Sequence, residues 1–199
     1  TNTSVEFATT SSTVSEGVGT LNLTLSITDE DATVDTEVDV VLIVGGAGRI
    51  NSYTTQTVTF PGGSSADETV TITVTDNGLC DGDATLTFEL QNITGGQGTA
   101  FVGTNDQYDL TITDNDLCTS VEFVSATSSG TEGGGTIALT LAITNPSGSV
   151  ATTVDVALTS GSAADVNSYT TQTVTFPAAS SANETVTITI TDDMLCEGP

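Results

Sequence analysis

The sequence predicts an all-β protein in which an antiparallel β-sandwich is repeated in tandem. Threonine, valine and isoleucine are abundant, apolar and polar residues alternate over short segments, and a large part of the chain occurs twice. β-Branched residues favour strands over helices. Alternation with a period of two is typical of strands that bury one face and expose the other. No segment shows a helical pattern, so the regular structure is predicted to be strand.

The first half of the chain is predicted to contain seven strands, separated by polar and turn-forming residues. They are marked by Val5 and Phe7 and by the alternating apolar residues within 21–27, 38–44, 58–60, 70–74, 86–90 and 108–112. Seven such strands in about 115 residues favour a two-layered sandwich.

The repeat has a shift of 116 residues, and Asn51–Phe60 recurs unchanged as Asn167–Phe176. When residues 3–83 are aligned with residues 119–199, 48 of 81 positions are identical. This is the duplication of a domain-sized unit. It predicts two domains of one fold, a complete sandwich over residues 1–117 and a second sandwich over residues 118–199.

The second domain is predicted to hold only the first five strands, because the given sequence ends where the sixth would begin. A sandwich without two of its strands leaves sheet edges and an apolar face open. We therefore expect the missing strands to come either from a longer polypeptide or from a neighbouring molecule.

The charge excludes several classes of function. The chain has 26 acidic residues, one basic residue (Arg49) and no histidine, so its formal net charge is −25. Such a surface repels nucleic acid and anionic lipid, and histidine-dependent catalysis is impossible. No run of about 18 apolar residues is present to insert into a membrane. A carboxylate pair of the glycosidase kind makes a poor active site without aromatic sugar platforms or a basic partner beside it, and one unit repeats the other, so we expect no enzyme.

Several segments, taken in order, resemble the Calx-beta domain family. They are Val5–Phe7, Ser15–Leu23, Ser52–Tyr53, Val58–Gly63, Val70–Asp76 and Leu110–Asp116. The resemblance covers the first unit and the first five strands of the second. It implies a seven-stranded, immunoglobulin-like sandwich. The family occurs in sodium/calcium exchangers, an integrin subunit and very large bacterial surface and gliding adhesins, and it often binds calcium.

Carboxylates gather in the loops that a sandwich of this kind brings to one end. Flexible loops rich in oxygen ligands suit Ca²⁺, and without a cation so many carboxylates would repel one another. The resemblance implies that the metal ligands are Glu16, Asp76, Asp81, Asp114 and Asp116 in the first unit and Glu132, Asp192, Asp193 and Glu197 in the second. Acidic positions of the family are replaced by Ser52, Ser168, Asn77 and Ala84, which implies weaker binding, in the range of about 10⁻⁴ to 10⁻³ M. The alternative is a set of ordinary solvated acidic turns.

Cys80 follows the fifth predicted strand and Cys118 follows the seventh, so both are expected at the same end of the first sandwich. A disulfide between them predicts an oxidising compartment, and the alternative is a pair of buried, reduced thiols. Cys196 repeats Cys80, and its predicted partner lies beyond the given sequence.

The function predicted from these features is a non-catalytic, extracellular structural repeat of a long surface adhesin or filament that calcium stiffens. Its partners are neighbouring repeats of the same polypeptide and an unidentified surface or glycan target. One alternative is a two-domain regulatory calcium sensor of the exchanger type. Another is a carbohydrate-binding or strand-exchanging assembly subunit.

Overall fold

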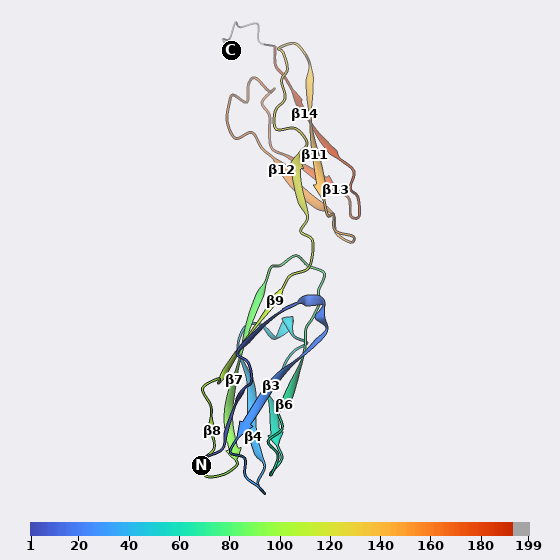
Figure 1. Ribbon diagram of the computed structural model, residues 1–199. Coiled ribbons are helices and arrows are strands. Elements are labelled where there is room, and N and C mark those ends of the chain that lie inside the picture. The colour runs from blue at the N-terminus through green and yellow to red at the C-terminus, as the bar shows by residue number, and fades with distance from the viewer. Residues whose placement is uncertain (193–199) are drawn as a thin grey trace. The chain divides into compact units, whose positions relative to one another are not determined.

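The computed structural model describes residues 1–192 and divides into two units (Figure 1). Unit 1 is Thr1–Asp116, and unit 2 begins at Leu117. Within the described residues, no helix is long and apolar enough to cross a membrane.

Unit 1 is a sandwich of two β-sheets. Its strands are β1 (Ser4–Phe7), β2 (Ser11–Ser15), β3 (Thr20–Thr28), β4 (Thr36–Val44), β5 (Gln56–Phe60), β6 (Glu68–Thr73), β7 (Ala84–Gly95), β8 (Phe101–Val102) and β9 (Gln107–Thr113). One sheet has the order β6-β3-β1-β8 and the other has the order β2-β9-β7-β4-β5. Two short 3₁₀ helices, η1 (Glu16–Val18) and η2 (Ala47–Arg49), interrupt the loops.

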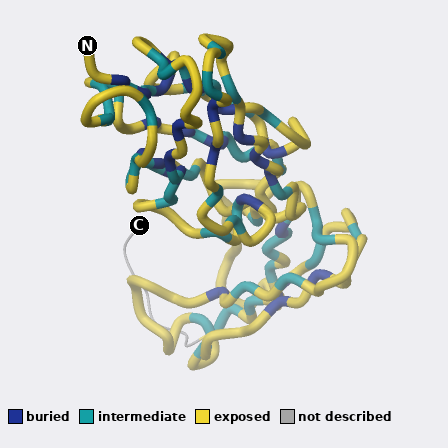
Figure 2. The backbone as a smooth tube through the Cα atoms, turned by 90° about the horizontal axis from the view of Figure 1, so that it is seen from below, coloured by how far each residue is buried: buried dark blue, intermediate teal, exposed yellow. Residues whose placement is uncertain are grey.

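The core of unit 1 lies between the two sheets and is formed by the alternating apolar residues. Phe7, Leu25, Val40, Phe88 and Leu110 are among the fully buried side chains, and their strand neighbours are more exposed. Figure 2 shows buried positions recurring along the strands between less buried ones. Each fully buried side chain of this size contributes about 1.5–3 kcal/mol relative to exposure. The all-β fold predicted from the alternation is confirmed.

Two details of the predicted sandwich are wrong, because unit 1 has nine strands and two of their pairings are parallel. The segment Ser11–Ser15 contains one apolar residue, Val14, so apolar alternation does not mark it as a strand. It crosses from the sheet of β1 to the other sheet, where it pairs in parallel with β9. The two-residue strand β8 pairs in parallel with β1. Both strands are held by backbone pairing, which the apolar pattern does not record.

Unit 2 repeats five strands of unit 1. They are β10 (Ser120–Phe123), β11 (Thr136–Thr144), β12 (Thr152–Val156), β13 (Gln172–Phe176) and β14 (Glu184–Thr189). Ser120 pairs with Thr144 as Ser4 pairs with Thr28, and Thr152 pairs with Phe176 as Thr36 pairs with Phe60. Each pair in unit 2 has the residue numbers of a pair in unit 1 plus 116, the shift of the sequence repeat. The two units therefore share one fold over these strands.

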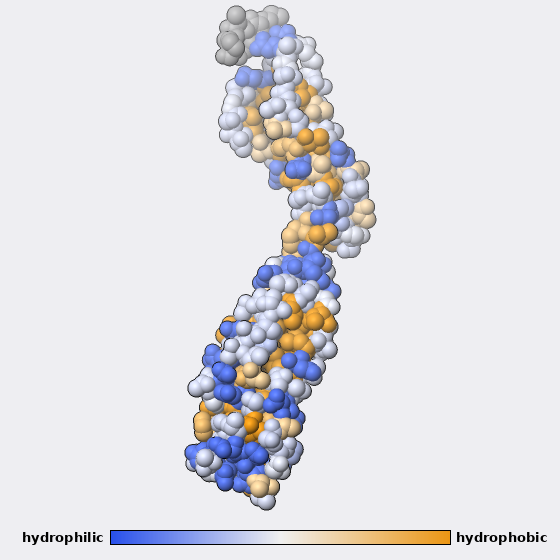
Figure 3. Space-filling model, viewed as in Figure 1, coloured by the Kyte–Doolittle hydropathy of each residue, from blue (hydrophilic) through white to orange (hydrophobic). Residues whose placement is uncertain are grey.

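The sheet formed by β12 and β13 is narrower than its counterpart in unit 1. There, β4 pairs with β5 on one edge and with β7 on the other. Within residues 117–192, β12 pairs only with β13. Leu158 is consequently 44% exposed, whereas its counterpart Leu42 is half-buried. Figure 3 shows apolar residues at the surface of unit 2 in this view.

The predicted disulfide is present. Cys80 and Cys118 are both disulfide-bonded, and since the chain has three cysteines they are bonded to each other. Cys80 follows β6 and Cys118 follows β9. Cys196, with its predicted partner beyond the given sequence, lies outside the described residues.

We predict that the double variant Cys80→Ser/Cys118→Ser lowers the free energy of unfolding of unit 1. Closing a loop of about 39 residues stabilises a fold by about 4 kcal/mol, because the bond restricts the unfolded chain. Urea unfolding of the oxidised parent and of the variant measures the difference. An unchanged denaturation midpoint would show that the bond does not stabilise the fold.

Candidate metal centre

The acidic end of unit 1 is built around Glu16, whose side chain is fully buried. The residue begins η1, directly after the polar strand β2. Glutamate is almost never fully buried unless it is paired, since removing its charge from water is costly. The side chains of Asn115 and Asp76 lie close to the next residue, since a Cβ at Gly17 would be 3.1 Å from Asn115 Nδ2 and 3.6 Å from Asp76 Oδ2.

Arg49 supplies the charge that accompanies Glu16. Its Nη1 donates to Glu16 Oε1, and its Nη2 lies 2.6 Å from Asp81 Oδ1 and donates to the carbonyl oxygen of Gly82 at 2.7 Å. Arg49 ends η2, in the connection between β4 and β5, and its side chain is 17% exposed. The only basic side chain of the sequence therefore lies among the carboxylates.

Asp114 joins two loops at this end. Its Oδ2 accepts the backbone N–H groups of Asp81 and Gly82 at 2.7 and 2.6 Å, and its Oδ1 accepts that of Asp116 at 2.8 Å. Its own N–H donates to Asp83 Oδ1 at 3.0 Å. Donation from the N–H groups of Asp116 and Gly82 lowers the pKa of Asp114, with smaller contributions from Asp81 and from the charge of Arg49, so its ionised form is favoured.

The surroundings of Asp116 raise its pKa, whereas those of Asp114 lower the pKa of that residue. Desolvation raises the pKa of Asp116, and the negative charges of Asp76, Asp114 and Asp81 raise it further. The Oδ2 of Asp116 is buried and has no hydrogen-bond partner among residues 1–192, and the same holds for Glu16 Oε2. Two buried carboxylate oxygens therefore lack hydrogen-bond donors in the described residues, although Arg49 pairs with the other oxygen of Glu16. A positive charge beside them would offset the loss of hydration.

The geometry fits a single cation. Glu16, Asp114 and Asp116 each offer one carboxylate oxygen, and these three atoms lie within 4.8 Å of one another. Calcium binds oxygen at 2.3–2.6 Å, so two oxygens on one ion are separated by at most about 5.2 Å. The three carboxylates can thus share one calcium ion, and two of these residues, Glu16 and Asp116, each have a buried oxygen without a hydrogen-bond partner in the described part of the chain.

The other predicted ligands of unit 1 lie around this group. Asp76 approaches Gly17 and acts electrostatically on Asp116, and Asp81 is paired with Arg49. Asn77 donates to Asp81 Oδ2 at 3.2 Å. The five predicted ligands of unit 1 are therefore neighbours, although only three of them form the close group. Ser52, which stands at an acidic position of the family, lines a polar hollow together with Asn51 and Tyr53.

The second unit does not repeat this centre within its described residues. Glu132, the counterpart of buried Glu16, is exposed, and so is Asp192. Asp192 approaches Gly133 as Asp76 approaches Gly17. The counterpart of Arg49 is Asp165, which reverses the charge at that position. The predicted ligands Asp193 and Glu197 lie outside the described residues.

Comparisons with known proteins agree with this fold. The Calx-beta domain model matches residues 1–116 and again residues 114–199, so the chain belongs to the Calx-beta domain family. The resemblance inferred from the motifs is confirmed. A search of curated proteins finds no match.

Two of the similar solved structures come from Calx proteins. The apo-form Calx CBD1 domain is 19% identical, with 58% of this chain and 100% of that chain covered and a TM-score of 0.51. The CBD12 structure from CALX1.2 is 15% identical, with 96% of this chain and 75% of that chain covered and a TM-score of 0.49. At these identities the likeness concerns the fold alone.

Sequence reasoning missed the role of Arg49. The sequence marks this residue only as the single base in the chain, and none of the segments that resemble the family includes it. One signal was available: within a repeat that is 48 of 81 positions identical, Arg49 is replaced by Asp165, next to the unchanged segment 51–60. A charge reversal beside an otherwise constant segment indicates different electrostatics at the two acidic ends.

We predict that Arg49→Met destabilises unit 1 in the absence of metal. The substitution leaves the buried Glu16 carboxylate unpaired, which lowers the free energy of unfolding by about 3 kcal/mol. The double variant Glu16→Gln/Arg49→Met removes both charges, so its loss of stability should be smaller than the sum of the losses in the two single variants. Chemical unfolding with chelator present is measured for the parent, for Glu16→Gln, for Arg49→Met and for the double variant. Losses that add within about 0.5 kcal/mol would show that the two side chains are not coupled.

Proposed function

We propose that the chain is a non-catalytic tandem module that binds calcium at the acidic end of unit 1. The observation that carries this proposal is the buried, unpaired Oε2 of Glu16 within a group that also includes Asp114 and Asp116. These three residues would hold the ion, with Asp76 and Asp81 beside it. Membership of the Calx-beta family supports the same assignment.

Calcium is favoured over other cations by the donor set. The close group offers carboxylate oxygens, which are hard ligands, and the chain has no histidine to attract zinc or copper. Magnesium demands a near-ideal octahedral shell and dehydrates reluctantly. The carboxylates lie in the segments after β2, β6 and β9. Such loops adapt more easily to calcium, which is the larger ion and accepts irregular geometry.

Arg49 and calcium would compete for the same oxygens. The guanidinium neutralises part of the acidic end before metal binds, so calcium has to displace it from Glu16 or bind beside it. The gain on binding is therefore smaller than at a site with no internal cation. This supports an affinity near the extracellular range of about 10⁻⁴ to 10⁻³ M.

The disulfide supports a location in an oxidising compartment, because such bonds are rare in reducing cytosol. We propose an extracellular structural repeat, in which calcium orders the acidic loops where one unit ends and the next begins in the sequence. Its partners would be neighbouring repeats of the same polypeptide, and a long surface adhesin or filament is the setting in which such a repeat adds length.

A two-domain calcium sensor is the second candidate, and the exchange of Arg49 for Asp165 favours it. Units with opposite charges at one position respond differently to calcium, which a regulator requires. Sensors bind calcium at about 10⁻⁷ to 10⁻⁵ M and extracellular modules at about 10⁻⁴ to 10⁻³ M. Calorimetric titration of the whole chain distinguishes the two: a dissociation constant near the millimolar range supports the structural repeat, and one at or below the micromolar range supports the sensor.

We predict that calcium raises the melting temperature of the parent and raises it less in Asp114→Asn. An ion that binds only the folded state adds about 2.7 kcal/mol when its concentration is a hundred times the dissociation constant. The substitution removes one anionic ligand and keeps the size of the side chain. Magnesium at the same concentration should have a smaller effect.

The matched control is Asp67→Asn, which removes a carboxylate just before β6, whereas the acidic end follows that strand. Unit 2 already has Asn183 at the corresponding position. This variant should respond to calcium as the parent does. If calcium leaves the parent's melting curve unchanged, or if both variants respond equally, the acidic end is a solvated surface and the proposal fails.

A further inference from the structure

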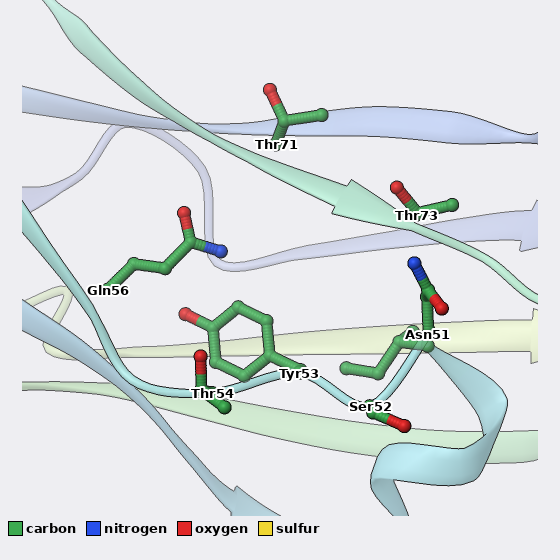
Figure 4. A pocket seen from close by; sticks show the side chains of 8 residues that line it. Asn51, Ser52, Tyr53, Thr54, Gln56, Thr71 and Thr73 are labelled. Carbon is green, nitrogen blue, oxygen red and sulfur yellow. The ribbon is translucent and has the colours of Figure 1, made fainter.

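A polar hollow occurs at the same place in both units, apart from the acidic group. In unit 1 it lies between β5 and β6, which are edge strands of the two sheets, and its volume is about 200 Å³. It is lined by Ile50, Asn51, Ser52, Tyr53, Thr54, Gln56, Thr71 and Thr73. In unit 2 a hollow of about 170 Å³ is lined by the corresponding residues, from Val166 to Thr189. Figure 4 shows Asn51, Gln56 and Thr73 around the ring of Tyr53.

The lining is retained between the two units more closely than the rest of the repeat. Seven of its eight residues are identical, and the eighth changes only from Ile50 to Val166. Several of the retained residues are exposed, among them Ser52 and Thr54. Packing alone does not require identity at exposed positions, and the exposed loop at residues 29–35 differs from its counterpart at most positions.

The backbone of the lining is also retained in an uncommon conformation. Asn51 and Ser52 have φ angles of 20° and 52°, and their counterparts Asn167 and Ser168 have φ angles of 51° and 54°. Positive φ is uncommon for residues other than glycine and costs free energy, least for asparagine. The same two-residue segment has this unfavourable backbone conformation in both units.

The tyrosine at the centre of each hollow is a fixed platform. Tyr53 donates its hydroxyl to the carbonyl oxygen of Val40 at 2.9 Å, and its ring packs edge-on against Phe88 with centroids 5.2 Å apart. Burial raises the pKa of Tyr53 to about 12, so it stays neutral. Tyr169 donates to Val156 in the same way, at 2.8 Å. Since the hydroxyls are already bonded within the fold, the rings offer a surface.

The chemistry of the lining selects the ligand. Hydroxyl and amide groups surround an aromatic ring, and no charged side chain takes part. A neutral ligand with many hydroxyl groups matches this surface, because each hydroxyl both donates and accepts. In unit 2 the Gln172 amide spans the hollow to the carbonyl oxygen of Thr187 at 3.4 Å, a long bond that a ligand hydroxyl can replace.

We propose that these hollows bind one sugar ring of a neutral saccharide, with the ring against Tyr53 or Tyr169 and its hydroxyls bonded to Gln56 and Thr73 or to Gln172 and Thr189. Anionic sugars are disfavoured because the chain carries a net charge of −25. A ligand of about a dozen heavy atoms in an open hollow binds at about millimolar affinity. Two linked copies gain avidity on a surface that displays many such sugars. The lining of the hollow shares no residue with the proposed calcium centre.

The test is a titration of the ¹⁵N-labelled whole chain, followed by NMR, with chelator present throughout so that calcium plays no part. The probes are methyl glucoside, methyl mannoside, methyl galactoside and N-acetylglucosamine, and glucuronate is the anionic comparison. At least one neutral probe should shift amide signals of residues 51–56 and 167–172, saturating at millimolar concentration. Glucuronate should shift them less.

The variant Gln56→Leu/Thr73→Val/Gln172→Leu/Thr189→Val keeps side-chain size and removes the hydrogen-bonding groups. It should weaken the response about tenfold, since two hydrogen bonds per site are lost. The control Thr59→Val/Thr175→Val changes exposed residues of β5 and β13 outside the hollows. It should leave the response of the amide signals to the sugar unchanged. The proposal is overturned if no neutral probe shifts these signals, if glucuronate binds as well as the neutral sugars, or if the two variants respond alike.

Discussion

The burial of the Glu16 carboxylate is the constraint on which the acidic end of unit 1 depends. A fully buried carboxylate requires a positive charge, and in the described residues it has the guanidinium of Arg49 on one oxygen and no partner on the other. The loops after β6 and β9 are arranged around this pair, since Asp81 contacts Arg49 and Asp114 accepts hydrogen bonds from Asp81 and Gly82. A buried ion pair adds little net stability, but it fixes where the remaining carboxylates lie.

The two units share a scaffold and differ in what they carry on it. The strand registers, the Tyr53 and Tyr169 hydroxyl bonds and the polar hollows coincide after a shift of 116 residues. The acidic ends do not, because Arg49 is replaced by Asp165 and buried Glu16 by exposed Glu132. A duplicated sandwich can vary its terminal loops without changing its core, since loops lie at the surface and tolerate substitution.

The sequence was sufficient to predict the strands that bury apolar residues, because alternation records burial directly. It was insufficient for β2, whose residues Ser11–Ser15 pair through the backbone and contribute only Val14 to the apolar surface. Strand order also indicates that the loops carrying Glu16, Asp114 and Asp116 share an end, and one carboxylate oxygen of each lies within 4.8 Å of the others. The assignment of the five carboxylates as metal ligands stays a prediction. The sequence could not predict the Arg49–Glu16 pair, since neither the burial of Glu16 nor the turn at η2 follows from residue type.

The central claim is that a calcium ion takes over the neutralisation of Glu16 that Arg49 provides without it. Diffraction from crystals of the whole chain grown with terbium, a calcium substitute that scatters anomalously, tests this directly. The account predicts an anomalous peak within bonding distance of Glu16, Asp114 and Asp116, with the guanidinium of Arg49 withdrawn from Glu16. A peak elsewhere, or no peak together with an intact Arg49–Glu16 pair at saturating metal, would contradict it.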